Sequence, residues 1–128
     1  MDKETLLEYC RIYNSGDYKK AISTYYAEDA VFEASDYRVE GRDNIIEFLS
    51  EGHTGLTEVM EFTNILIEGD RIAVELEAEF TAMEDKPDSH IRALKKGDSF
   101  KLKMSSFYKV KDEKISHIRI YRFTKWSQ

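Results

Sequence analysis

Apolar side chains recur at helical spacing near the start of the chain, at Leu6, Tyr9, Cys10 and Tyr13. This spacing places them on one face and predicts a first helix over about residues 3–14. The helix is expected to stop at Gly16, because glycine readily adopts the left-handed conformation that ends helices. Asp17 then offers a carboxylate that caps a second helix, whose apolar face is Tyr18, Ala21, Ile22 and Tyr25.

The spacing changes from helical to alternating at residues 30–34, which predicts a strand soon after the second helix. A short extended piece at about residues 38–40 follows and ends at Gly41. Asp43 is then expected to cap a third helix, whose buried side is Ile45, Phe48 and Leu49. The first part of the chain is therefore predicted to contain three short helices, with one strand and one extended piece between the second and the third.

The remainder alternates apolar and polar residues and predicts four strands, at about residues 60–67, 72–83, 100–110 and 115–124. Strict alternation means that one face of a strand packs against the core and the other is exposed to solvent. The wet face carries glutamates in the second of these strands and lysines in the third, namely Glu75, Glu77, Glu79, Lys101, Lys103 and Lys109. If these strands are antiparallel neighbours, opposite charges meet across them. We interpret them as a solvated ladder or a dimer surface rather than as a catalytic site.

The chain has 128 residues, a size that suits one domain spanning residues 1–128. Its net charge is −6, with both signs interspersed, which argues against nucleic acid and against an anionic membrane surface as partners. Cys10 is the only cysteine, so no intrachain disulfide can form and a cytoplasmic location is the simplest expectation. The sequence has no metal-ligand spacing, and neither a metal nor a cofactor is expected.

Four stretches of the sequence resemble the NTF2-like superfamily: YNSGDYKKAISTYYAEDAVFEA, VEGRDNIIEFLSE, IEGDRIAVELEAEF and SSFYKVKDEKISHIRIYRF. Within it they look most like the SnoaL-like polyketide cyclase and ketosteroid isomerase branch, over about residues 6–123. The resemblance implies an α+β, cystatin-like cone, in which three N-terminal helices pack on a curved, mostly antiparallel β-sheet. Such a cone leaves an apolar pocket open at one end, and the superfamily uses it for several chemistries as well as for binding alone.

The resemblance extends to only some of the catalytic residues of ketosteroid isomerase. That enzyme uses an aspartate base with a tyrosine and a protonated aspartate as donors to the oxyanion. The tyrosine falls on Tyr9, which matches, but the base falls on Ala34, which cannot take a proton. The second donor falls near Ser106, whose hydroxyl is a weaker donor. The aspartate of the family's epoxide hydrolases would fall near Ile120, so that chemistry is not expected either.

If the apolar phase of each strand faces the pocket, a set of polar groups points into it from the sheet and the first helix. The Arg122 guanidinium can donate two hydrogen bonds to a carboxylate or an enolate. A shift of one residue in the strand register would turn Tyr121 inward instead. This composition suits a small apolar or aromatic ligand that bears oxygen. The substrate-binding candidates are Tyr13, Phe32, Phe80, Met104, Ser106, Tyr108, Ile118 and Arg122.

Two residues are candidates for the missing general base. Asp36 lies two positions beyond Ala34 and so in the same phase, near the expected mouth of the pocket. His53 lies at the end of the third helix, and histidine is a residue type whose unperturbed pKa suits proton transfer. Either could instead be structural, Asp36 as a loop acid and His53 as a helix-end residue. The catalytic candidates are therefore Asp36, His53 and Tyr9.

Three functions remain open from the sequence. The first is a cofactor-free isomerase, cyclase or dehydratase that acts on a small carbonyl compound, with Tyr9 and Arg122 stabilising the enolate oxygen. The second is a ligand-binding protein that uses the same pocket without catalysis, which the alanine at position 34 favours. The third is an interaction module, because the outer face of the sheet is expected to form a homodimer.

Overall fold

The protein is described by a computed structural model that covers residues 1–89 and 92–123. Three helices are present in the described part: α1 (Lys3–Asn14), α2 (Tyr18–Tyr25) and α3 (Arg42–Gly52). The strands are β1 (Tyr26–Ala34), β2 (Tyr37–Glu40), β3 (Leu56–Glu68), β4 (Arg71–Ala82), β5 (Ser99–Lys111) and β6 (Lys114–Arg122). The fold class is therefore α+β, as the sequence predicted, with the third helix separated from the first two by β1 and β2.

Local signals set the corner between α1 and α2. The N-terminus of α1 is capped by Asp2, whose Oδ1 accepts a hydrogen bond from the Thr5 amide at 2.8 Å. Hydrogen bonding by the Thr5 side chain, and then by the Thr5 amide, lowers the pKa of this carboxyl. Gly16 has a φ of +87°, a left-handed conformation that a residue with a Cβ adopts only with strain. Asp17 then caps α2 by accepting from the Lys20 amide at 3.0 Å, which confirms the predicted cap.

The start of α3 differs from the prediction. Gly41, not Asp43, occupies the cap position, and no side chain caps this helix. The reason is the tight entry from β2: Gly41 has a φ of +92°, and its amide donates to the Ala30 carbonyl of β1. Asp43 lies in the first turn instead, where its charge is favourable near the positive end of the helix dipole.

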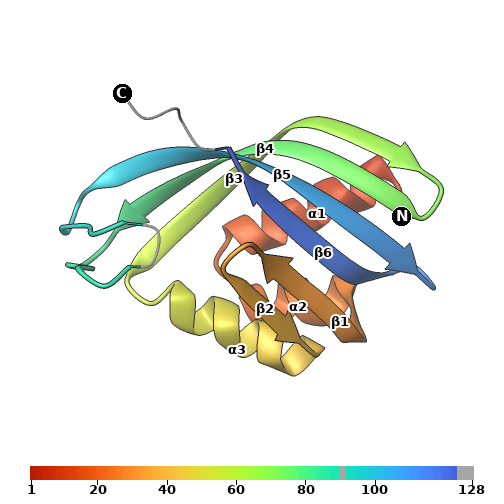
Figure 1. Cartoon of the computed structure of the whole chain (residues 1–128), viewed down its shortest axis with the longest axis horizontal. Helices are drawn as coiled ribbons and strands as arrows, with labels where there is room; N and C mark the ends of the chain where they lie inside the picture. Colours follow the sequence, from red (N-terminus) through yellow and green to blue (C-terminus); the bar gives the residue numbers. More distant parts are fainter. Residues whose placement is uncertain (90–91, 124–128) are drawn as a thin grey trace.

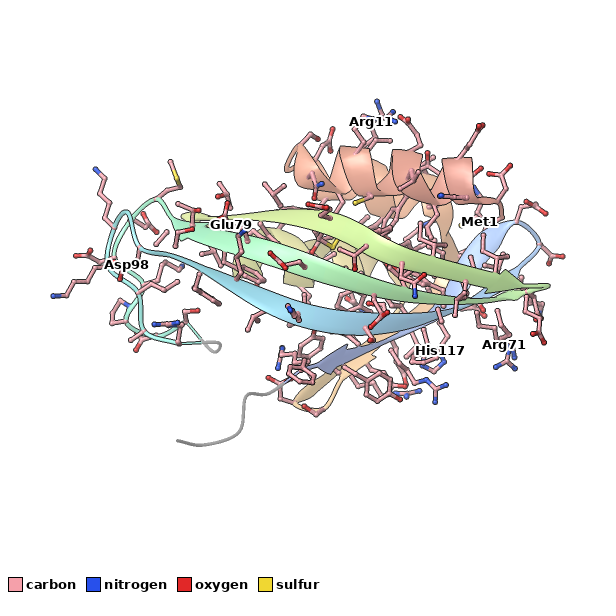
Figure 2. The ribbon with its side chains drawn as sticks, turned by 90° about the horizontal axis from the view of Figure 1, so that it is seen from above. Met1, Arg11, Arg71, Glu79, Asp98 and His117 are labelled. Carbon is pink, nitrogen blue, oxygen red and sulfur yellow. The ribbon has the colours of Figure 1, made fainter. Side chains whose placement is uncertain are left out.

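The strands form one curved sheet in the order β2-β1-β6-β5-β4-β3, which does not close on itself. The β1–β6 pair is parallel and the other pairs are antiparallel, so the sheet is mostly antiparallel, as expected. The helices cover one face of the sheet (Figure 1). Figure 2 shows this from a second side, with Arg11 on the outer side of α1 and with His117 and Arg71 on the opposite side of the sheet.

Two strands begin about four residues earlier than their alternation indicated. β1 begins at Tyr26, which is completely buried, but a register shift between Tyr26 and Val31 breaks the alternation there. β3 begins at Leu56, and its inward residues at this end include Glu58, an acid where the pattern expects an apolar side chain. Both departures lie in segments that meet the helices, and the second one places Glu58 against Tyr13 and His53.

The outer face of the sheet carries the predicted ladder of charges. Glu77 pairs with Lys103 and Glu79 with Lys101 across β4 and β5, and the Lys101 ammonium lies 3.3 Å from the Glu77 carboxylate. Lys109 faces Arg71 rather than a glutamate, so that part of the expected ladder is wrong. In the part of the chain that the structure describes, no helix has the length and apolar character that crossing a bilayer requires.

Candidate functional site

A cavity of about 490 Å³ opens where the end of α3, the start of β3, the end of β4 and the following loop meet. These segments lie together at one end of the sheet in Figure 1. Its volume lies in the range of ordinary small-molecule sites. Its lining combines apolar and aromatic side chains with several charged groups, and the principal members are Tyr13, Phe48, His53, Leu56, Glu58 and Phe80.

Glu58 is the central polar group of this cavity. Only 7% of the residue is exposed, and a carboxylate so deeply buried needs hydrogen-bonding partners. Its Oε1 accepts a hydrogen bond from the Tyr13 hydroxyl at 2.9 Å and lies 2.8 Å from Nε2 of His53. Three elements therefore meet at one oxygen atom: α1 through Tyr13, the end of α3 through His53, and β3 through Glu58.

The backbone determines which nitrogen of His53 carries a hydrogen. Nδ1 lies 2.6 Å from the Leu49 carbonyl, which can only accept, so Nδ1 is the donor in this contact. The contact between Nε2 and Glu58 Oε1 then needs one further proton. That proton gives either an imidazolium with a carboxylate or a neutral imidazole with a carboxylic acid. We call these two residues the dyad; its net charge is zero in both arrangements.

Aromatic rings hold the imidazole in place. The Tyr18 ring stacks on His53 with centroids 4.3 Å apart and an interplanar angle of 30°. Tyr13 contacts the same imidazole edge-on, with centroids 6.1 Å apart. The ring of His53 therefore has one face covered and both nitrogens engaged, so its side chain is fixed before any ligand binds.

The second oxygen of Glu58 is available to a ligand. Oε2 has no hydrogen-bond partner among the described residues, whereas Oε1 has two. Among the described residues, every side-chain oxygen or nitrogen that is fully inaccessible to solvent has a hydrogen-bond partner. Since Glu58 lines the cavity, Oε2 is the oxygen that the cavity can reach.

Burial controls the ionisation of the tyrosines around the dyad. Burial, and then the nearby charge of Glu58, raises the pKa of Tyr13 well above its ordinary value. The same two causes, in the same order, raise the pKa of Tyr18. Both phenols are thus neutral at physiological pH, and the Tyr13 hydroxyl is a permanent donor to Glu58.

Three of the candidates from the sequence lie in this cavity: Tyr13, His53 and Phe80. Tyr9 is 1% exposed and its hydroxyl lies 2.9 Å from the Tyr26 hydroxyl, away from the lining. The other candidates from the sheet interior lie in the core or are packed against it and do not line the cavity, namely Phe32, Met104, Ser106, Tyr108 and Ile118.

Asp36 and Arg122 lie elsewhere and contact one another. The Arg122 guanidinium donates to Asp36 Oδ1 at 3.1 Å and lies over the Tyr37 ring, 5.9 Å from its centroid. The Asp36 side chain is 43% exposed, so this is a pair at the surface rather than in a cavity. Tyr121, the alternative inward residue, is 52% exposed.

Glu58 was not among the residues predicted from the sequence, although one signal for it is present. Leu56, Glu58, Met60 and Phe62 alternate with exposed residues in β3, so that an acid occupies an inward position among apolar side chains. Burial of an acidic side chain among apolar residues costs folding free energy unless the carboxyl group has hydrogen-bonding partners. Within residues 1–89 and 92–123, no group of three or more histidine, cysteine or acidic side chains is arranged to hold a metal ion.

The chain matches a known protein family over most of its length. A model of the SnoaL-like domain matches residues 6–118, and the protein therefore belongs to the SnoaL-like family. This confirms the resemblance to the NTF2-like superfamily that the sequence motifs indicated. No curated protein sequence matches this chain.

Solved structures share the fold at low sequence identity. A Shewanella denitrificans protein with the provisional name SnoaL-like polyketide cyclase is 17% identical, with a TM-score of 0.79 over 94% of this chain and 89% of that chain. A hypothetical protein from Catenulispora acidiphila with a ketosteroid isomerase-like fold, solved with trimethylamine, is 14% identical, with a TM-score of 0.75 over 94% and 86%. An M. tuberculosis epoxide hydrolase is 12% identical, with a TM-score of 0.73 over 94% and 80%. Identities this low show the fold alone.

The buried tyrosines predict an alkaline transition. Burial raises the pKa of Tyr9, Tyr13, Tyr26 and Tyr108, so the unfolded chain ionises these phenols first, near pH 10. Their contribution to stability is therefore complete below about pH 10 and is lost as the pH rises above it. Tyrosinate absorbance and circular dichroism followed together should show these phenols ionising in the same step as unfolding. Gradual ionisation with the dichroism unchanged would contradict this.

Proposed function

We propose that the protein is a cofactor-free isomerase, cyclase or dehydratase that transfers a proton on a small carbonyl compound bound in the cavity. The observation that carries the proposal is the position of Glu58, a carboxyl group more than nine-tenths buried beside a cavity of small-molecule size. Its partners leave one oxygen facing that cavity, and a base placed against a bound ligand is what proton abstraction from carbon needs. Membership of the SnoaL-like family supports a small-molecule pocket.

The proton steps can be written on the dyad. With His53 as imidazolium and Glu58 as carboxylate, Oε2 of Glu58 takes the proton from the carbon beside the carbonyl. The C–H bond breaks, an O–H bond forms on Glu58, and the electron pair moves into an enolate. Return of this proton to a different carbon completes an isomerisation. If the substrate carries a β-hydroxyl, Glu58 gives the proton to that hydroxyl instead. The C–O bond then breaks, water leaves and a C=C bond forms.

The neighbouring groups have separate roles in this proposal. In this proposal His53 holds Oε1 of Glu58 through its Nε2, and the Leu49 carbonyl holds the imidazole ring in position. Tyr13 positions the carboxylate through its hydrogen bond to Oε1. Glu58 thus takes the role that the sequence analysis gave to Asp36, and His53 remains in the catalytic centre. Tyr9 and Arg122 have no direct role in it.

A binding protein without catalysis is the alternative use of the same cavity. The Catenulispora acidiphila neighbour was solved in complex with trimethylamine, which supports a site for a small organic ligand in this fold. The apolar and aromatic lining supports a compact, partly aromatic compound in either case. The two functions differ only in whether Glu58 exchanges a proton with the ligand.

Replacement of Glu58 separates these alternatives. We expect Glu58→Gln to lower proton exchange by at least about a hundredfold, because the amide keeps the shape but cannot accept the proton. The measurement is deuterium incorporation from heavy water into a panel of small ketones, followed by NMR. Asp36→Asn is the matched control and should leave exchange unchanged. Equal exchange by wild type and Glu58→Gln would contradict the assignment of the base, and no exchange at all would favour the binding protein.

We also propose a homodimer through the outer face of the sheet, opposite the helices in Figure 2. This face is acidic along β3 and β4, at Glu61, Glu75, Glu77 and Glu79, and basic along β5 and β6, at Lys101, Lys103, Lys109 and Arg119. A two-fold axis parallel to the strands would place the acidic half of one copy on the basic half of the other. Exposed apolar side chains between the charges, namely Leu66, Phe107 and Tyr121, support burial of this face.

A single charge in this face should separate the copies. Phe107 is 47% exposed at the centre of the proposed interface, and Phe107→Lys would bury an unpaired charge there. Light scattering after gel filtration should give a dimer for the wild type and a monomer for this variant. Leu7→Lys, on the exposed side of α1, is the control and should stay dimeric. A monomeric wild type would refute the proposed dimer without affecting the active-site proposal.

A cytoplasmic location remains a proposal that rests on one residue. Cys10 is the only cysteine, and it is buried and unpaired, which fits a reducing compartment. Cell fractionation tests it, and recovery from an oxidising compartment would contradict it.

A further inference from the structure

The mouth of the cavity carries an excess of negative charge. Glu51 at the end of α3 and Asp85 and Asp88 in the loop after β4 line it, against a single lysine, Lys86. No ion pair joins any of these three carboxylates to a described residue. Asp85 is held by a hydrogen bond from the Lys96 amide at 2.9 Å, which leaves its charge in place. The described rim therefore presents three negative charges and one positive charge.

The interior does not cancel this charge. Because His53 and Glu58 share one proton, the dyad contributes no net charge in either arrangement. Glu58 nevertheless has one unpartnered oxygen that the cavity reaches, in a residue more than nine-tenths buried. A cleft with charge of one sign and low-dielectric walls concentrates the electric field and attracts ligands of the opposite charge.

The lining also suits a cation in its apolar part. Tyr13, Phe48 and Phe80 contribute aromatic rings to the cavity, and ring faces attract ammonium groups. Arg122, which the sequence analysis offered to a carboxylate, is bound to Asp36 outside the cavity. Within the described lining only Lys86 and a protonated His53 are cationic, and the imidazole is already engaged by Glu58. An anionic ligand would therefore meet repulsion at the rim with little compensation.

We propose that the ligand of this cavity is a small organic cation, an amine or quaternary ammonium compound with a compact apolar body. The inference rests on the proposed function only in that it takes the cavity as the ligand site. A cationic ligand also fits the proposed proton transfer. The cavity provides little positive charge to stabilise an enolate, so the substrate has to supply it. An ammonium group close to the carbon that loses its proton supplies that charge from the substrate itself.

Three ligands of nearly the same shape and different charge test the proposal. They are choline, neohexyl alcohol, in which carbon replaces the nitrogen, and the anion tert-butylacetate. Titrations followed by NMR at the side chains of Tyr13 and Phe48 report binding in the cavity. Choline should bind at least about fivefold more tightly than the alcohol, and the anion most weakly. The advantage of choline should shrink as salt rises from about 20 mM to about 500 mM.

A matched pair of variants locates the effect. Glu51→Gln removes a rim carboxylate and should reduce the preference for choline by about twofold to threefold. Glu47→Gln makes the same change one turn earlier on the exposed side of α3, outside the lining, and should leave the preference unchanged. Equal losses in the two variants would mean that the charge of the whole protein, not the rim, attracts the cation, and this would overturn the proposal.

Other outcomes also overturn it. Absence of choline binding, or binding no tighter than that of the alcohol, would exclude a cation-selective cavity, as would preferential binding of tert-butylacetate. These results leave the proton-transfer proposal standing, because that is tested by deuterium exchange in Glu58→Gln. Conversely, choline selectivity together with unchanged exchange in Glu58→Gln would retain the ligand class and remove the proposed base.

Discussion

The site depends on the sharing of one proton between two side chains that are almost excluded from water. A carboxylate as buried as Glu58 would be strongly unfavourable alone, and removal of one partner of such a pair commonly costs about 3–5 kcal/mol. Nε2 of His53 shares that proton with Oε1 of Glu58, and the Tyr13 hydroxyl donates a second hydrogen bond to the same oxygen. Because these partners come from the C-terminal ends of α3 and α1, both helix ends must be placed correctly on β3. The requirement ties the curvature of the sheet to the chemistry of the cavity.

This arrangement also explains how a polar site can exist inside an apolar core. The dyad is neutral overall, so its burial costs far less than that of a free charge. The charge that a ligand meets on approach comes instead from the exposed rim at Glu51, Asp85 and Asp88. The two proposals, selection of the ligand by charge at the mouth and proton transfer by Glu58, therefore depend on different residues.

Much of the fold was predictable because its signals are local. The apolar stripe of α1, the stop at Gly16 and the cap at Asp17 all act within a few residues, and alternation identified most of the sheet. Of the residues predicted for the site, only Tyr13, His53 and Phe80 line the cavity. Glu58 was missed because its partners are 45 residues away in Tyr13 and at the end of a helix in His53, and periodicity does not reveal such pairings. For Arg122, phase alone could not show that β6 ends there and that Asp36 lies within reach of its side chain.

The hydrogen on His53 tests the central claim most directly. Heteronuclear NMR of the imidazole nitrogens should show Nδ1 carrying a hydrogen that exchanges slowly, because the Leu49 carbonyl accepts from it, and Nε2 coupled to Glu58. In Glu58→Gln the Nε2 signal should change strongly while Nδ1 keeps its hydrogen. A ring with Nδ1 unprotonated, or an Nε2 signal that ignores the loss of the carboxylate, would show that the shared proton does not exist.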